Sequence, residues 1–283
     1  MKILVTGSCG GFGKWVIKEL IEGGHTAIGV DLQAPKGLPF ASLVANLQNS
    51  GEVYSVLSDV CPDAIINLAA IPRPGIASAR QTFLTNFEVA YNIFEAAANL
   101  GIKKIVHAST DSSYGFVFAK HPIKPLYLPL DEAHPQLPQD CYGGSKLHNE
   151  LTAQMFSRAY PDMCFTCLRI CWLIAPEELS GFARRDDTIE SVAGEWRGLF
   201  SYVDMRDAAV AFRLAAEKAY LGFEAFNITA ADTTTKIETK QLISRFFPDA
   251  EIRKEIQGCG ALFSTEKAER ALGWHPKHTW REI

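Results

Sequence analysis

The sequence lacks long apolar runs and lacks a strong excess of charge of either sign. No apolar stretch reaches the roughly 18 residues that a membrane-spanning helix needs, and a strand candidate begins too close to Met1 to leave room for a signal peptide. Lys and Arg number 28 against 32 Asp and Glu, a net charge of −4, and no segment is strongly basic. These absences argue against a membrane or secreted protein and against nucleic-acid binding, so we expect a cytoplasmic globular protein.

A disulfide framework is missing as well. The seven cysteines are odd in number and scattered from Cys9 to Cys259, as expected for reduced thiols in a reducing compartment. Cys164, Cys167 and Cys171 have a spacing that superficially resembles a metal site, but they lie in an apolar run of strand length. Because side chains alternate along a strand, Cys164 and Cys167 would point to opposite faces, and we expect no bound metal.

Strand and helix patterns alternate along the first 171 of the 283 residues. Strands are expected at 2–6, 26–31, 42–45, 63–69, 104–109 and 164–171, and helices at 11–22, 50–60, from 83 to a close at 101, and at 142–159. Such alternation predicts an α/β fold of the Rossmann type, a doubly wound parallel sheet with helices on both faces. No internal repeat interrupts it.

The alternation of strand and helix patterns is less regular in the rest of the chain. A proline-rich loop in the 120s and 130s is expected to form a wall or lid, and residues 172–200 are irregular. A helix is expected at 204–217, a strand at 224–228, and further helices near 236–247 and 264–272.

A glycine-rich loop, Thr6-Gly7-Ser8-Cys9-Gly10-Gly11-Phe12-Gly13, joins the first strand to the first helix. Gly7 permits a tight turn, Gly10 lets the backbone approach a pyrophosphate, and Gly13 lets the helix pack on the strand. The helix N-terminus offers N–H groups and a positive dipole end to phosphates. Asp31 ends the second strand, where a carboxylate binds an adenosine ribose and repels a 2′-phosphate. The loop therefore predicts NAD as cofactor, in preference to NADP.

A second motif, Tyr142-Gly-Gly-Ser-Lys146, opens a helix and places both side chains on one face. An ammonium beside a phenol favours the phenolate, so Tyr142 would act as a base near neutral pH, and Lys146 would also hold the nicotinamide ribose. In isolation such a pair is a common surface feature. Its meaning here depends on the glycine loop.

A third motif runs from Ser109 to Gly115 at the end of the fifth strand. Ligands bind at the carboxyl ends of strands in open parallel sheets, and a hydroxyl there would hold the reacting oxygen against Tyr142. The alternative is a polar turn that only caps the strand.

Together these motifs resemble the extended short-chain dehydrogenase/reductases, the NAD-dependent epimerase/dehydratase family, over nearly the whole chain. Asn67–Ala70, Asn86, Asn92–Ala97 and Leu272–Pro276 add to the resemblance. It implies that Tyr142 is the general acid/base, Lys146 its pKa partner, and Thr110 the polarising hydroxyl, with Ser109 as a substitute. It also implies the following cofactor contacts: Gly7, Gly10, Gly11, Phe12, Gly13, Asp31, Leu32, Asn46, Leu47, Leu68, Ala69, Ala70, Asn86, Tyr142 and Lys146.

Departures from the family pattern narrow the substrate. Ser112 stands where family dehydratases carry a second acid, which argues against dehydration. Trp172 replaces a usual Asn, and only residues 177–200 occupy the place of a long nucleotide-gripping insert, so a compact substrate is expected. The stretch 169–177 followed by Arg184 and Arg185 is similar to uronate dehydrogenases, in which an arginine grips a substrate carboxylate. The alternative for this pair is a solvated turn neutralised by Asp186 and Asp187. The expected substrate contacts are Arg73, Ser109, Thr110, Trp172, Arg184 and Arg185.

The leading hypothesis is an NAD-dependent oxidoreductase that transfers hydride between NAD and a hydroxyl of a small sugar, sugar acid or polyol. Residues 1–171 would form the NAD-binding Rossmann domain with the catalytic pair, and residues 172–283 a smaller α+β substrate-binding region partly interleaved with it. The alternatives are a sugar or nucleotide-sugar epimerase with tightly bound NAD, and a non-catalytic dinucleotide-sensing regulator, although regulators tend to lose the Tyr/Lys pair. The helices at 83–98 and 142–159 are the expected surface of a homodimer.

Overall fold

The computed structural model describes residues 1–33, 37, 39–218 and 221–283. Its centre is a seven-stranded sheet of β1 (Lys2–Thr6), β2 (Thr26–Asp31), β3 (Ala41–Val44), β4 (Ala64–Asn67), β5 (Lys104–Thr110), β7 (Cys164–Ile170) and β10 (Gly222–Ile228). The strand order is β10-β7-β5-β4-β1-β2-β3, and all neighbouring strands run parallel. The predicted Rossmann-type α/β fold is confirmed.

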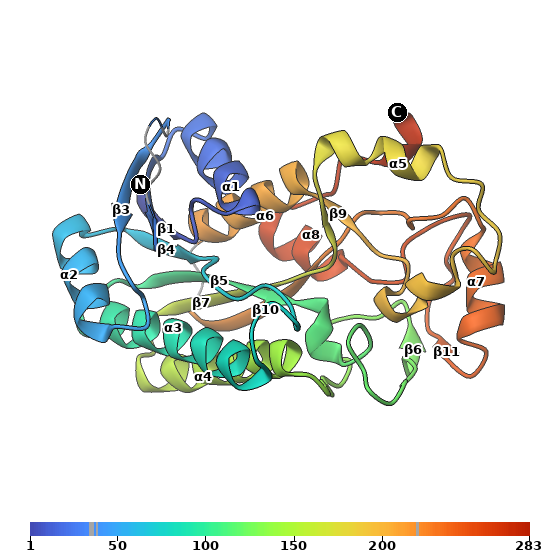
Figure 1. The fold of residues 1–283 in the computed structure, drawn as a ribbon, viewed down its shortest axis with the longest axis horizontal. Coiled ribbons are helices and arrows are strands. Elements are labelled where there is room, and N and C mark those ends of the chain that lie inside the picture. Colours follow the sequence, from blue (N-terminus) through green and yellow to red (C-terminus); the bar gives the residue numbers. More distant parts are fainter. Residues whose placement is uncertain (34–36, 38, 219–220) are drawn as a thin grey trace.

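Helices cover both faces of this sheet (Figure 1). One face carries α1 (Gly11–Glu22) and α6 (Met205–Glu217), and the other carries α2 (Ser50–Val60), α3 (Ala79–Asn99) and α4 (Cys141–Ala159). Helix α3 begins four residues before the predicted start, because Ser78 Oγ accepts a hydrogen bond from the Gln81 N–H and caps a polar first turn. Within the described part of the chain, no helix is long and apolar enough to cross a bilayer.

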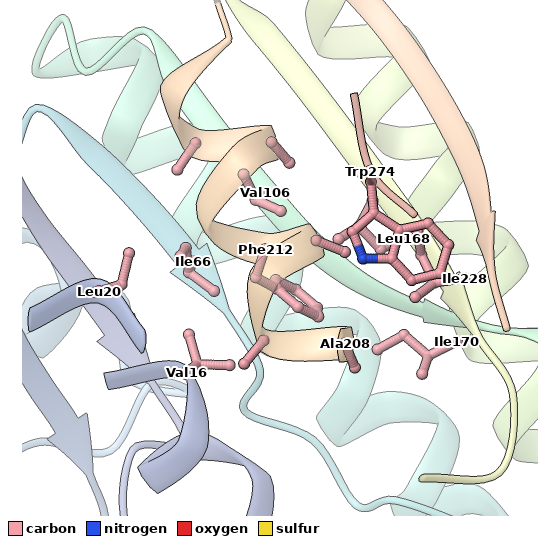
Figure 2. Close-up of a cluster of buried hydrophobic side chains, with 14 of the residues drawn as sticks. Val16, Leu20, Ile66, Val106, Leu168, Ile170, Ala208, Phe212, Ile228 and Trp274 are labelled. Atoms are coloured by element: carbon pink, nitrogen blue, oxygen red, sulfur yellow. The ribbon is translucent and has the colours of Figure 1, made fainter. Parts of the chain in front are cut away.

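The core on the α1/α6 face unites distant parts of the sequence (Figure 2). Leu20 of α1, Ile66 of β4 and Phe212 of α6 belong to this cluster with Trp274, which follows the last α-helix, α8 (Glu266–Leu272). Trp274 is fully buried, and its indole Nε1 donates to the Asp207 carbonyl at 2.8 Å. The C-terminal segment therefore completes the core of a sheet that begins at residue 2.

The region after residue 171 is interleaved with the first part. Helix α6 and strand β10 return to the central sheet, whereas the remaining elements build a smaller α+β unit at the end of the molecule away from β3 (Figure 1). That unit contains β6 (Tyr127–Leu128) paired with β11 (Glu251–Ile252), β8 (Leu173–Ile174) paired with β9 (Val203–Asp204), α5 (Ser180–Ala183), α7 (Thr239–Phe246) and 3₁₀ turns at 176–178, 193–198 and 280–282. The proline-rich loop forms part of it, because Phe116, Leu128 and Leu130 pack in the same apolar cluster as Phe200 and Leu242.

Candidate active site

A cavity of about 1130 Å³ lies at the carboxyl end of the sheet. It lies at the switch point between β1 and β4, from which the following strands are added in opposite directions across the sheet. Most residues predicted from the sequence line it: Gly7, Gly10, Gly11, Phe12, Gly13, Asp31, Leu32, Asn46, Leu47, Leu68, Ala69, Ala70, Arg73, Ser109, Thr110, Tyr142, Lys146 and Trp172. Three of the predicted residues, Asn86, Arg184 and Arg185, do not line it.

The glycine loop packs directly on the loop after β4. Gly7 adopts φ +67°, and a Cβ there would lie 3.0 Å from the backbone nitrogen of Ala69. A Cβ on Gly13 would lie 2.3 Å from the Gly7 carbonyl oxygen, so only glycine lets α1 approach β1 this closely. Thr6 Oγ1 accepts hydrogen bonds from the Leu68 and Ala69 N–H groups, both at 3.2 Å. Gly11, Phe12 and Gly13 form the first turn of α1 and line the cavity. The first turn of a helix has N–H groups without intrahelical partners, so this geometry fits a pyrophosphate.

Asp31 lies at the other side of the glycine loop. Its Oδ2 accepts the Cys9 N–H at 2.9 Å and its Oδ1 accepts the Leu32 N–H at 2.8 Å. A carboxylate offers about four acceptor positions, and the described residues occupy two of them, so the carboxylate could still accept from the hydroxyls of a ribose. Asp31 thus both shapes the loop and fits an adenosine ribose.

Asn86 has a different place from the one expected. It is buried in α3, where its Oδ1 accepts the Ile71 N–H at 2.7 Å and its Nδ2 donates to the Ile71 carbonyl at 3.1 Å. It fixes the loop that continues from Leu68–Ala70. Asn86 therefore supports the cavity wall from behind.

Tyr142, Lys146 and Thr110 all line the cavity. Lys146 is buried, its Nζ donates to the Ala108 carbonyl at 2.7 Å, and the Nζ lies 5.9 Å from the centre of the Tyr142 ring. Burial lowers the pKa of Lys146 to about 8. Burial also raises the pKa of the Tyr142 phenol, a hydrogen bond with Thr110 lowers it, and Asp111 and Asp140 raise it. The sequence predicts a phenol made acidic by the ammonium. In the structure the ammonium is held by Ala108, and Thr110 is the group that favours the phenolate.

Asp111 is a second ionisable group on the cavity wall. It is buried at the start of a 3₁₀ turn, 111–114, and burial raises its pKa to about 7 while hydrogen bonds from Thr110 and Ser112 oppose the rise. A carboxyl that is about half protonated at neutral pH therefore lies beside the Thr110 hydroxyl.

The far end of the cavity is built by the irregular segment after β7. Trp172, 56% exposed, lines it together with Glu195 and Arg197 of the turn at 193–198. Arg197 Nη1 donates to the Ala119 carbonyl at 2.7 Å. The sequence analysis did not predict Arg197 as a site residue. Arg197 lies in the same irregular segment, 172–200, as Arg184 and Arg185, so its position in that segment was the available signal.

The predicted arginine pair lies elsewhere. Arg184 is exposed, and Arg185 pairs with Asp187 at 3.1 Å and with Glu195 at 2.7 Å. Arg185 follows the short helix α5, and its guanidinium is engaged by these two carboxylates, of which Glu195 lines the cavity and Asp187 does not. The alternative interpretation, a basic turn neutralised by neighbouring acids, describes Arg185 better than a substrate contact does.

The cysteines of β7 lie on a strand, as predicted. Phe165 and Cys167 belong to the apolar cluster on one face of the sheet, and Leu168 and Ile170 to the cluster on the other. Among the residues whose structure is described, no group of three or more His, Cys, Asp or Glu is arranged to hold a metal ion.

A parallel Rossmann sheet with a glycine loop at its switch point, an acid at the end of β2, and a Tyr/Lys pair and a Thr that line the same cavity is typical of a dinucleotide-dependent short-chain dehydrogenase/reductase. Residues 3–229 match the model of the NAD dependent epimerase/dehydratase family. The chain belongs to this family. It is an enzyme, and its cofactor is NAD.

Known relatives include both epimerases and dehydrogenases. The UDP-glucose 4-epimerase of Corynebacterium glutamicum is 24% identical over an alignment 311 positions long. The alignment covers 99% of this chain and 92% of the relative. The L-arabinose 1-dehydrogenase (NAD(P)(+)) of Haloferax volcanii is 26% identical over 204 residues, which cover 70% of this chain and 76% of the relative. A short-chain dehydrogenase/reductase superfamily protein from Agrobacterium tumefaciens, solved with bound NAD, has the same fold, with a TM-score of 0.74, 22% identity and coverage of 99% of this chain and 94% of that one.

Proposed function

We propose that the protein is an NAD-dependent dehydrogenase that oxidises a hydroxyl group of a small sugar, sugar acid or polyol. The observation that carries this proposal is that Thr110, Tyr142 and Lys146 line the same cavity as the glycine loop. NAD supplies reversible hydride transfer. Tyr142 takes the proton of the substrate hydroxyl. The Thr110 hydroxyl, which donates to Asp111 Oδ1 at 3.1 Å in this structure, would turn to hydrogen-bond the same substrate oxygen.

The cavity lining also supports an assignment of residues to the cofactor. Asp31, Leu32, Asn46 and Leu47 would hold the adenosine end, and the glycine loop the pyrophosphate. Leu68, Ala69 and Ala70 would line the middle, with Tyr142 and Lys146 at the nicotinamide ribose. Asn86 would act only through the position of Ile71.

Sugar acids are the substrates that the far end of the cavity favours. Glu195 is already engaged, because it pairs with Arg185 and accepts from the Thr234 hydroxyl. Among the described residues no carboxylate forms an ion pair with Arg197, and only its Nη1 has a hydrogen bond, to Ala119. The remaining N–H groups of a guanidinium match a carboxylate in a bidentate arrangement. Arg197 takes over the role that the sequence assigned to Arg184 or Arg185, with Trp172 and Arg73 as further substrate contacts.

The decisive experiment is NADH formation with a panel of aldoses, uronates and aldonates, with Tyr142→Phe as control. We expect turnover of at least one sugar acid by the parent enzyme and none by Tyr142→Phe. A panel in which both proteins give no NADH would count against a dehydrogenase.

An epimerase is the second candidate, because the curated relatives include UDP-glucose 4-epimerases. An epimerase runs both half-reactions on one retained NAD. It would therefore convert its substrate without added cofactor and would copurify with NAD. The non-catalytic regulator has less support, since Thr110, Tyr142 and Lys146 all line the cavity.

We also propose a cytoplasmic homodimer in which residues 172–283 supply the substrate contacts Trp172 and Arg197. Helices α3 and α4 pack side by side and expose Leu84, Leu151 and Met155. Exposed apolar side chains on adjacent helices are typical of a contact between subunits. The seven free cysteines agree with a reducing compartment.

A further inference from the structure

Two consecutive residues of β5 are tied by hydrogen bonds to two successive turns of α4, and the next residue lies at the same cavity as Tyr142 of that helix. The Ala108 carbonyl accepts from Lys146 Nζ at 2.7 Å, and the Ser109 hydroxyl donates to Glu150 Oε1 at 2.5 Å. The next residue, Thr110, lines the cavity together with Tyr142, and its hydroxyl donates to Asp111 Oδ1 at 3.1 Å. Because Tyr142, Lys146 and Glu150 are spaced four apart, they lie on one face of the helix. The end of the strand therefore has a fixed register against the helix that carries the candidate base.

Glu150 is the member of this series that the proposed reaction does not use. It is fully buried, and its carboxylate is held in two places by Arg169 of β7, Nη2 to Oε2 at 2.7 Å and Nε to Oε1 at 3.0 Å. Arg169 is itself oriented by donating to the Tyr114 hydroxyl at 2.9 Å and the Glu132 carbonyl at 3.0 Å. A buried ion pair needs such additional hydrogen bonds to offset its desolvation, and with them it fixes one geometry.

The chain after Thr110 is tied to the same carboxylate. Gln136 Nε2 donates to Glu150 Oε2 at 3.2 Å and to Ser113 Oγ at 2.8 Å. The Ser113 hydroxyl in turn donates to the Thr110 carbonyl at 2.7 Å. Thr110 is thus held from both sides, through Ser109 before it and Ser113 after it, and both connections end at Glu150.

We propose that Ser109 and Glu150 are positioning residues that hold the end of β5 in register with α4, and so fix the place of Thr110 relative to Tyr142, with Arg169 orienting the Glu150 carboxylate. This inference rests on the proposed function, in which Thr110 and Tyr142 act on the substrate oxygen. It also gives Ser109 a role different from the substrate contact expected from the sequence, since its hydroxyl proton is committed to Glu150.

The test uses Ser109→Ala, which removes one hydroxyl, and Glu150→Gln, which keeps the shape of the side chain and removes its charge. With the best substrate of the panel we expect kcat to fall about 10- to 100-fold in each variant, because small displacements of reacting groups cost this much. The KM for NAD should change by less than about 2-fold. The rise of activity with pH should move to higher pH, because the neighbouring Thr110 side chain lowers the pKa of Tyr142 and a displaced Thr110 would lower it less.

Thr239→Ala is the matched control. Thr239 is fully buried, and its hydroxyl donates to the Gly260 carbonyl at 2.7 Å in the C-terminal region. This variant should lose thermal stability much as Ser109→Ala does, with unchanged kcat and pH profile. If Ser109→Ala behaves like Thr239→Ala, the positioning role is overturned. Ser109→Ala decides the question even if Glu150→Gln fails to fold.

Crystal structures of the parent and Ser109→Ala with NAD separate this inference from the proposed function. A longer distance between Thr110 Oγ1 and Tyr142 Oη in Ser109→Ala supports positioning whether or not the parent turns over any sugar. An unchanged distance overturns it. Absence of turnover by the parent with the distance lengthened would instead overturn only the proposed function.

Discussion

Asp111 and Lys146 are buried ionisable side chains that both titrate close to neutral pH. Burial raises the pKa of Asp111 from 3.8 to about 7 and lowers the pKa of Lys146 from 10.5 to about 8. Between pH 3.8 and about pH 7, Asp111 binds more protons in the native state than in the unfolded chain. The stability of the protein therefore falls as the pH rises through this range. For Lys146 the unfolded chain binds more protons between pH 8 and 10.5, so stability rises there. The enzyme maintains both groups at a cost in stability near neutral pH, as expected of residues kept for chemistry.

Asp111→Asn isolates the first of these effects. The amide keeps the shape of the side chain and cannot ionise, so the variant avoids the cost of a buried carboxylate above pH 7. Between pH 4 and pH 7.5 its free energy of unfolding should rise relative to the parent by about 2–4 kcal/mol. Urea denaturation at several pH values measures this. Curves that stay parallel across the range would show that Asp111 titrates normally.

Arg197→Gln tests the substrate carboxylate, with Arg184→Gln as matched control. We expect Arg197→Gln to raise the KM for a uronate by about 10- to 100-fold, the value of a charge-assisted hydrogen bond, and to leave the KM for a neutral aldose nearly unchanged. Arg184 is exposed and outside the cavity, so its variant should match the parent in both assays. A raised KM for the uronate in Arg184→Gln, with an unchanged KM in Arg197→Gln, would instead support Arg184 as the residue that binds the substrate carboxylate.

At the scale of single residues, the sequence predicts what is local. The glycine loop, Asp31, and the Tyr142/Lys146 pair are recognisable because their spacing matches a strand–turn–helix or one helix face. Arg197 reaches the cavity only through the packing of an irregular segment against the loop at Ala119. The pKa of Tyr142 depends on burial, which spacing does not reveal. These features therefore could not be predicted.

At the scale of elements, helix α1 depends on the absence of one side chain. A Cβ at position 13 would lie 2.3 Å from the Gly7 carbonyl oxygen and 2.8 Å from the Ser8 Cα, both backbone atoms that cannot move aside. Gly13→Ala should push α1 away from β1 and cost about 1–3 kcal/mol or more of unfolding free energy. At Gly11 of the same helix an added Cβ meets nothing within 4 Å, so Gly11→Ala should be neutral or stabilising. Thermal unfolding of the apo-proteins measures both, and equal losses would contradict the steric argument.

Long elements were predictable and short ones were not. Helices α1 and α2 and strands β1 and β2 have the expected bounds because each carries a clear periodicity between turn residues. Strands β6, β8, β9 and β11 are two residues long each, and they exist only because a partner segment lies beside them. Strand β10 begins two residues before the expected start, since pairing with β7 extends to Gly222. Pairing of this kind is a tertiary property that a local pattern does not contain.

At the scale of the whole molecule, the central parallel sheet is not complete at residue 171. Strand β10 pairs with β7 along its full length, from Gly222 opposite Cys164 to Ile228 opposite Ile170. Helix α6 supplies Phe212 and a series of alanines to the core on the α1 face, and Trp274 closes that core. A chain that ends at residue 171 would expose the edge of β7 and the apolar side chains that α6 covers.

We therefore expect a fragment of residues 1–171 to be unable to fold alone. It should lack a cooperative urea transition followed by circular dichroism, and it should bind NADH far more weakly than the full chain, because loss of several core side chains at about 2–5 kcal/mol each exceeds the usual net stability of a domain. Addition of residues 172–283 in trans should restore both properties, since that piece carries α6, β10 and Trp274. The single variant Trp274→Ala is a milder form of the same test and should cost about 3–5 kcal/mol. A cooperative transition with normal NADH binding in the 1–171 fragment would show instead that the sheet is complete without β10.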